Sequence, residues 1–154
     1  MKYSFQLMTQ QQAEEIADYW HYEGQYSFYD MDADQEDLQE FLDPEKRRDS
    51  YFVVMDQAEL IGFYSFTQVM AGTIDIGLGL KPNLTGKGNG AEFLKAGLEF
   101  AQSEYNPKQI TLSVAAFNTR AINLYKNHGF TEVEHFLQKT NGGSFEFLKM
   151  IYHC

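Results

Sequence analysis

Residues 113–130 read Ser113-Val-Ala-Ala-Phe-Asn-Thr-Arg-Ala-Ile-Asn-Leu-Tyr-Lys-Asn-His-Gly-Phe130, and they carry the most specific information in the chain. The segment begins in a β-rich run over residues 110–115, and residues 119–127 then have the apolar spacing of a short helix. His128-Gly129 ends that helix, because glycine readily adopts the left-handed conformation that closes a helix. A strand that passes directly into a helix is typical of an α/β domain.

A second segment of this kind lies upstream and reads Leu78-Gly-Leu-Lys-Pro-Asn-Leu-Thr-Gly-Lys-Gly-Asn-Gly90. It predicts a strand, a glycine-rich turn and the start of a helix. Glycines allow backbone N–H groups to converge on one point, and the helix start adds the positive end of its dipole. The segment therefore predicts a phosphate-binding turn, with a glycine-rich turn that binds no ligand as the alternative.

Two common phosphate-binding motifs do not account for this turn. A P-loop is excluded because Lys81 and Gly88 stand where it requires a glycine and a serine or threonine. The spacing Gly86-x-Gly88-x-x-Ala91 fits the dinucleotide-binding fingerprint. That fingerprint also requires an acidic residue at the end of the following strand, where residues 114–117 are Val-Ala-Ala-Phe. The dinucleotide interpretation therefore lacks its second requirement.

Taken together, the two segments resemble motifs A and B of the GNAT superfamily, the acyl-CoA-dependent N-acyltransferases. The family's turn reads Gln/Arg-x-x-Gly-x-Gly/Ala, and it falls on residues 85–90, where both glycines are present and Thr85 occupies the first position. The second motif reads Asn-x-x-Ala-x-x-x-Tyr-x-x-x-Gly-Phe, and it is matched throughout, by Asn118, Ala121, Tyr125, Gly129 and Phe130. The resemblance covers roughly residues 51–137. It implies an N-acetyltransferase that transfers acetyl from acetyl-CoA to an amine.

The remaining segments predict a single α/β (α+β) domain over residues 1–154. Periodicity predicts helices over residues 10–22, 34–42 and 91–105, and strands over residues 51–55, 60–66, 73–80, 130–136 and 145–151. The order is ααβββαβαββ, and the turn Asn141-Gly-Gly-Ser144 joins the last two strands. The resemblance implies a GNAT-like fold, in which a mixed central sheet has helices on both faces.

The resemblance also implies where the coenzyme binds. The strands at residues 73–80 and 110–115 would diverge at their carboxyl ends, and the pantetheine arm would pair with the backbone of Leu78 and Leu80 like an added strand. The phosphates would meet the turn and the helix start, formed by Thr85, Gly86, Lys87, Gly88, Asn89 and Gly90. Asn118 and Ala121 would face the coenzyme from the next helix, which Asn118 would also cap.

For catalysis, the resemblance points to Tyr125, whose hydroxyl would protonate the departing thiolate of the coenzyme. The alternative for Tyr125 is a core aromatic residue of a short amphipathic helix. Family members take the proton of the attacking amine with an acid on the strand before the glycine turn, or with a chain of waters. Asp75 is the only charged residue between Glu59 and Lys81 and lies in an apolar strand, so it is the candidate base. The alternative for Asp75 is an exposed residue near a strand end.

The negative charge of the chain is concentrated in its first third. The formal net charge is −10, while residues 3–45 contain twelve Asp or Glu and no Lys or Arg. The same region contains a group of aromatic residues, at Tyr19, Trp20, Tyr22, Tyr26, Phe28 and Tyr29. Aromatic walls with carboxylates bind cations. In the family that the chain resembles, this region borders the acceptor, so the resemblance implies a small cationic amine or a basic protein amino terminus as acceptor, with Asp30, Asp32 and Asp34 in its wall. The alternative is an aromatic core beneath solvated helix faces.

Composition argues against several other classes of function. The acidic balance disfavours nucleic-acid binding, which needs clustered Lys and Arg. No apolar run has the length of a membrane span or signal peptide, so we expect a cytoplasmic protein without membrane contact. The histidines lack the spacing of metal ligands and the only cysteine is Cys154, so we expect no metal site and no internal disulfide. A homodimer stays open, as does a non-catalytic acyl-CoA-binding sensor or scaffold with the same fold.

Overall fold

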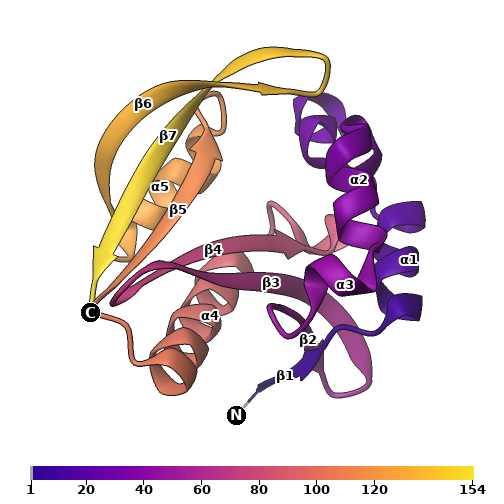
Figure 1. Cartoon of the computed structure of the whole chain (residues 1–154), viewed down its shortest axis with the longest axis horizontal. Helices are drawn as coiled ribbons and strands as arrows, with labels where there is room; N and C mark the ends of the chain where they lie inside the picture. Colours follow the sequence, from indigo (N-terminus) through magenta and orange to yellow (C-terminus); the bar gives the residue numbers. More distant parts are fainter. Residues whose placement is uncertain (1) are drawn as a thin grey trace.

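The computed structural model describes residues 2–154 and is built on a seven-stranded mixed sheet (Figure 1). The strands follow the spatial order β1-β2-β3-β4-β5-β7-β6. Their bounds are β1 Tyr3–Leu7, β2 Tyr51–Asp56, β3 Glu59–Met70, β4 Thr73–Leu80, β5 Gln109–Ala115, β6 Thr131–Thr140 and β7 Gly143–His153. The helices are α1 Gln10–Tyr19, α2 Gln35–Leu42, α3 Pro44–Arg47, α4 Gly90–Tyr105 and α5 Thr119–Asn127. Short 3-10 helices span Gly24–Tyr29, Met31–Ala33 and Pro82–Leu84.

The predicted α/β fold with a mixed sheet is confirmed, but the predicted order omits strand β1 and the short helix α3. Strand β1 pairs antiparallel with β2 at one edge of the sheet. Its sequence Tyr3-Ser-Phe-Gln-Leu7 alternates apolar and polar residues, which is the period of a half-buried strand, so a signal was present and was missed. Its hydrogen bonds come from β2, a partner strand that is distant in sequence, so the tertiary structure was needed to identify its place in the sheet.

Helix α1 begins as predicted and ends earlier. The Gln12 N–H donates to Thr9 Oγ1 over 3.1 Å, and the Thr9 N–H donates to Gln12 Oε1 over 2.9 Å, which completes a capping box. The helix ends at Tyr19, short of the predicted residue 22, because Trp20 has an extended backbone and its side chain is buried in the core. The chain then continues into the 3-10 helix Gly24–Tyr29.

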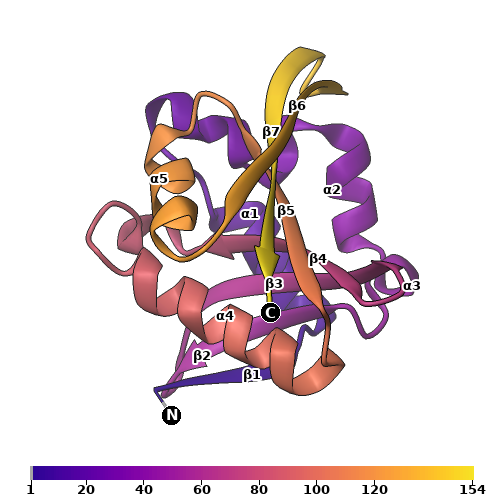
Figure 2. The ribbon, with the colours of Figure 1, turned by 90° about the vertical axis from the view of Figure 1, so that its left-hand side faces the viewer.

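Helices cover both faces of the sheet, as predicted. Adjacent residues of a strand point to opposite faces, and Val53 and Val54 of β2 are both buried but belong to different cores. Val54 lies in the core that contains residues of α4 and α5, whereas Val53 lies in the core that contains residues of α1 and α2. In Figure 2, α4 lies in front of the sheet and α1 lies behind it.

Strands β4 and β5 separate at their carboxyl ends, as the resemblance implied. Their parallel pairing covers three residue pairs and stops at Asp75↔Thr111. Beyond that point β4 stays paired with β3 as far as Leu80↔Gly62, and β5 stays paired with β7 as far as Ala115↔Phe147. The facing edges of β4 and β5 therefore have backbone groups that the sheet does not pair.

The β6–β7 hairpin reaches across this opening and touches the amino-terminal region (Figure 1). The Asn141 N–H donates to Asp34 Oδ2 over 2.9 Å, and Asn141 Nδ2 donates to the Phe28 carbonyl over 2.9 Å. The Phe28 ring also packs edge-on against Phe145 of β7, with ring centroids 4.9 Å apart. The hairpin thus ties the β5–β7 side of the sheet to the helices that cover the β2–β3 side.

Candidate active site

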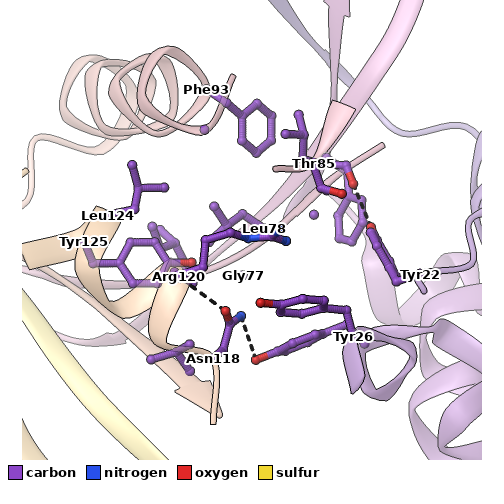
Figure 3. Close-up of a pocket in the computed structure, with 18 of the residues that line it drawn as sticks. Tyr22, Tyr26, Gly77, Leu78, Thr85, Phe93, Asn118, Arg120, Leu124 and Tyr125 are labelled. Atoms are coloured by element: carbon purple, nitrogen blue, oxygen red, sulfur yellow. Dashed lines mark hydrogen bonds between the residues drawn. The ribbon is translucent and has the colours of Figure 1, made fainter. Parts of the chain in front are cut away.

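A cavity of about 810 Å³ lies where β4 and β5 diverge (Figure 3). We call it the slot cavity. Its lining comes from α1, the 3-10 helix Gly24–Tyr29, α2, strands β2 to β5, the glycine turn with the start of α4, and α5. Its volume is in the range of sites that bind small molecules and cofactors.

Most of the predicted coenzyme-binding residues meet in this cavity. Nine of them line it, namely Leu78, Leu80, Thr85, Gly86, Gly88, Gly90, Asn118, Ala121 and Tyr125. Lys87 and Asn89 lie on the same turn but do not line the cavity, and Lys87 is exposed to solvent. The tertiary structure therefore brings the two sequence motifs to one place.

The glycine turn has the backbone geometry that a phosphate site requires. Gly86 and Gly88 have φ values of +70° and +82°, which glycine adopts without steric cost. A Cβ at Gly88 would meet no protein atom within 4 Å, so the space beside it is open. Helix α4 begins at Gly90 with no side-chain cap from Asn89, which leaves the first N–H groups of the helix available to an anion.

Two residues at this end of the cavity already have hydrogen-bond partners. Thr85 Oγ1 donates to the carbonyl of Pro82 over 2.8 Å, so its side chain is turned back toward its own loop. Tyr22 Oη donates to the carbonyl of Leu80 over 2.7 Å, at the end of β4. Burial raises the pKa of the Tyr22 hydroxyl, which therefore stays a donor.

Asn118 is buried at the start of α5, where both halves of its amide are used. Its Oδ1 accepts from the Ala121 N–H over 3.2 Å, which confirms the predicted N-cap. Its Nδ2 donates to Tyr29 Oη over 3.1 Å, so the same side chain also contacts the amino-terminal region. A role toward the coenzyme stays a prediction.

Tyr125 is buried on α5 and projects toward the middle of the slot cavity (Figure 3). Its ring packs against Phe130, with centroids 5.7 Å apart, so Tyr125 is a core residue that also lines the cavity. Burial raises the pKa of its hydroxyl, and the nearby Tyr29 raises it further. The hydroxyl therefore keeps its proton at physiological pH and is available as a donor.

Asp75 does not line the slot cavity. It lies on β4 two positions before Gly77, which does line the cavity and faces the same side of the sheet. Thr111 Oγ1 donates to Asp75 Oδ1 over 2.7 Å. Burial raises the pKa of the Asp75 carboxyl, while the hydrogen bond from Thr111 and the charge of Lys149 act in the opposite direction. Its role as a base stays a prediction.

The acids that line the cavity are Asp37 and Glu40 of α2, and this corrects the predicted wall. Asp30 accepts from the Tyr22 N–H over 2.8 Å, and Asp34 accepts from the Asp37 N–H over 3.1 Å as the N-cap of α2. Asp30, Asp32 and Asp34 do not line the cavity, and two of them hold local structure instead. Partial burial raises the pKa of the Asp37 carboxyl, and the charges of Asp34 and Glu40 raise it further.

The predicted aromatic wall is confirmed in part. Trp20, Tyr22, Tyr26 and Tyr29 line the cavity, whereas Tyr19 is 76% exposed and Phe28 packs under the β6–β7 hairpin. Sequence reasoning missed Arg120, which also lines the cavity. A signal was present in the sequence. A cation in the first turn of a helix interacts unfavourably with the helix dipole, which indicates that Arg120 has a function other than stabilising the helix.

In the described part of the chain, one group outside the cavity has the spacing of metal ligands, His21 with Asp30 and Asp32. Both ring nitrogens of His21 are already hydrogen-bonded, to Asp30 and to the Asp18 carbonyl.

Among residues 2–154, no helix combines the length and the apolar character needed to cross a membrane.

Comparison with known proteins finds a matching family and similar solved structures. The chain matches the Acetyltransferase (GNAT) family over residues 12–130. A chimera of the spermidine N-acetyltransferase SpeG from Vibrio cholerae and hSSAT is 20% identical, over 99% of this chain and 96% of the chimera, with a TM-score of 0.74. A GNAT-family acetyltransferase from Bacillus anthracis is 16% identical, over 99% of this chain and 95% of that chain, with a TM-score of 0.75. A dodecameric spermidine N-acetyltransferase from Vibrio cholerae is 22% identical, over 99% and 94%, with a TM-score of 0.71. A comparison with curated proteins finds none that matches.

Proposed function

Because the chain belongs to the acetyltransferase (GNAT) family, we propose that this acetyl-CoA-dependent N-acetyltransferase acts on a small cationic amine. One observation carries the proposal. The slot cavity joins the glycine turn and the buried Tyr125 to a wall that holds Asp37 and Glu40. A coenzyme and a cationic acceptor can therefore bind in one continuous cavity.

The residues at the coenzyme end fit acyl-CoA. Gly86 and Gly88 have the positive φ values and the open space that a phosphate needs, and the uncapped start of α4 adds N–H donors. The edge of β4 at Leu78 and Leu80 lines the cavity and would pair with amides of the pantetheine arm. The non-catalytic alternative shares these features, so it is separated from the enzyme by chemistry and not by binding.

The coenzyme would supply acetyl as a thioester, whose carbon–sulfur bond breaks as the acceptor nitrogen bonds to the carbonyl carbon. Tyr125 would donate its hydroxyl proton to the departing sulfur, and burial keeps that proton in place until then. Asp75, or water that connects it to the cavity beside Gly77, would take the proton of the amine. The raised pKa of Asp75 makes it a stronger base than an ordinary carboxylate.

The acceptor end favours a cation. Asp37 and Glu40 lie one helical turn apart on α2, and the charge of Glu40 makes the Asp37 carboxyl harder to ionise. A bound cation would relieve this repulsion, and the ring of Trp20, which lines the same cavity, adds a face that attracts cations. Spermidine, the substrate in the names of similar structures, is an amine of this charge class. We therefore propose a linear amine with more than one positive charge as the preferred acceptor class.

The test is a panel of acceptors offered with acetyl-CoA, with free thiol release as the readout. The panel contains spermidine, an aminoglycoside, a peptide with a basic amino terminus, a neutral amine and an amino acid with a free carboxylate. We expect the highest kcat/KM for the polyamine, and a preference that weakens with salt, because exposed charges are screened over about 8 Å at physiological ionic strength. A neutral or anionic best acceptor would overturn the proposed acceptor class. No thiol release above the acceptor-free background with any member of the panel would favour the non-catalytic alternative.

A further inference from the structure

Arg120 lies directly against the glycine turn. It lines the slot cavity from the first turn of α5, and a Cβ built on Gly86 would lie 2.9 Å from Arg120 Nη1. In Figure 3 its side chain extends across the cavity toward Thr85. This brings a guanidinium to the turn whose backbone geometry suits an anion.

The charge of Arg120 has no carboxylate partner. The chain contains 22 Asp and Glu, yet none of the ion pairs among residues 2–154 includes Arg120. Its guanidinium instead lies over the Tyr26 ring, 4.3 Å from the centroid. A ring contact holds a guanidinium in place without neutralising it, so its N–H groups stay available to an anion. Tyr26 thus holds the cation beside the turn.

Thr85, at the first position of the glycine turn, offers no free side-chain donor to a phosphate. In the family's turn the first position carries Gln or Arg, whereas Thr85 has a short side chain whose hydroxyl is bonded to the Pro82 carbonyl. Lys87 is on the turn but does not line the cavity. Arg120 is therefore the basic side chain that lines the slot cavity at the glycine turn.

We propose that Arg120 binds the pyrophosphate of the coenzyme at Gly86, in place of the side chain that Thr85 does not offer, and that Tyr26 is its positioning residue. The inference rests on the proposed acyl-CoA site. A guanidinium matches phosphate oxygens with two parallel N–H donors, which a lysine at the same position could not do. The contact would also link the coenzyme to the 3-10 helix Gly24–Tyr29, which borders the acceptor.

The test is calorimetric binding of CoA to the full chain and to Arg120→Gln. Removing a charge-assisted contact to phosphate should raise the dissociation constant roughly ten- to a hundredfold. Arg120→Lys keeps the charge and should recover only part of this loss. Lys126→Gln is the matched control, because it makes the same charge change on α5 outside the cavity and should bind CoA like the parent. Melting temperatures without ligand check that each variant is folded.

Truncated ligands identify the phosphate. With dephospho-CoA, which lacks the 3′-phosphate, the ratio between Arg120→Gln and parent should be unchanged. With pantetheine, which lacks the pyrophosphate, the ratio should approach one. A ratio that disappears with dephospho-CoA would overturn the pyrophosphate assignment, and a ratio that persists with pantetheine would make Arg120 a structural residue only.

Tyr26 is tested in a double-mutant cycle. Tyr26→Leu should weaken CoA binding in the parent and have no further effect in Arg120→Gln, because its role acts through Arg120. Additive effects of the two changes would overturn the positioning role. Failure of the parent to bind CoA would refute the proposed acyl-CoA site itself, whereas equal binding by parent and Arg120→Gln would refute only the role of Arg120.

Discussion

Asn118 Nδ2 donates a hydrogen bond to Tyr29 Oη over 3.1 Å, and this contact joins the start of α5 to the amino-terminal region. The same 3-10 helix also places Tyr26 beneath Arg120. Residues on the proposed acceptor side thus touch the elements that would border the coenzyme. Substitutions in this region should therefore be assayed with both the coenzyme and the acceptor.

Tyr29→Phe should lower stability, because it removes the acceptor of the buried Asn118 amide and keeps the ring. We expect the free energy of unfolding to fall by about 1 kcal/mol, measured by urea denaturation. Tyr19→Phe removes a hydroxyl from a side chain that is 76% exposed and should be neutral. Equal effects of the two changes would show that the contact with Asn118 contributes nothing to stability.

Gly88→Val should abolish stabilisation by the coenzyme. Saturation with CoA at a hundred times its dissociation constant adds about 2.7 kcal/mol, or roughly 5–10 °C in melting temperature. Valine at a φ of +82° is strained, and its side chain would fill the space that a phosphate needs. The readout is the difference in melting temperature with and without CoA.

The control for backbone strain is Gly142→Val in the β6–β7 turn. Gly142 also has a positive φ, +78°, and a Cβ there would also meet no atom within 4 Å. This variant should lose stability but keep the shift with CoA. Loss of the shift in both variants would mean that strain, and not the phosphate site, explains the result.

Tyr125→Phe should lower kcat on the order of 10²-fold while CoA binding is retained. Phenylalanine keeps the ring that packs on Phe130, so the comparison isolates the hydroxyl. Steady-state kinetics and calorimetry measure the two quantities separately. Unchanged turnover would assign protonation of the thiolate to water, and Tyr125 would then have a packing role alone.

Neutralising the acids that line the cavity should weaken binding of the acceptor and leave binding of the coenzyme unchanged. We expect Asp37→Asn and Glu40→Gln each to raise the KM of a cationic acceptor roughly two- to fivefold, because both carboxylates are partly solvated. Glu36→Gln is the matched control on α2, since Glu36 does not line the cavity. A control effect as large as that of Asp37→Asn would reduce the role of these acids to the overall field of the chain.

Asp75 should govern the acidic limb of the pH–rate profile. Its pKa is raised above the ordinary value of 3.8, so a base at this position becomes active only at a correspondingly higher pH. Thr111→Val removes a hydrogen bond that lowers this pKa, and it should move the limb to higher pH. Asp75→Asn should remove the limb together with most of the turnover. Identical profiles in all three proteins would exclude Asp75 as the base.

The raised pKa of Asp75 also predicts how the stability of the fold depends on pH. Between 3.8 and the raised pKa, the folded protein holds a proton on Asp75 that the unfolded chain has lost, so stability falls as the pH rises through this range. Asparagine does not titrate, so Asp75→Asn should show a smaller fall in urea denaturation over the same pH range. An unchanged slope would contradict the raised pKa.

Local sequence was sufficient for the features that depend on a few neighbouring residues. The glycine turn was identifiable because Gly86 and Gly88 adopt positive φ values that few other residues tolerate. The start and end of α5 were identifiable because Asn118 caps the helix and Gly129, with a φ of +99°, ends it. Most strands and helices followed from periodicity for the same reason.

Tertiary structure was needed wherever segments distant in the sequence meet. Strand β1 exists because β2 pairs with it, and Arg120 reaches Gly86 because β4 and β5 separate after three residue pairs. The choice of Asp37 and Glu40 over Asp30 and Asp34 as cavity acids depends on how α2 packs on the sheet and on which carboxylates cap backbone N–H groups. Composition counts charges, but burial and hydrogen bonding determine which of them face a ligand.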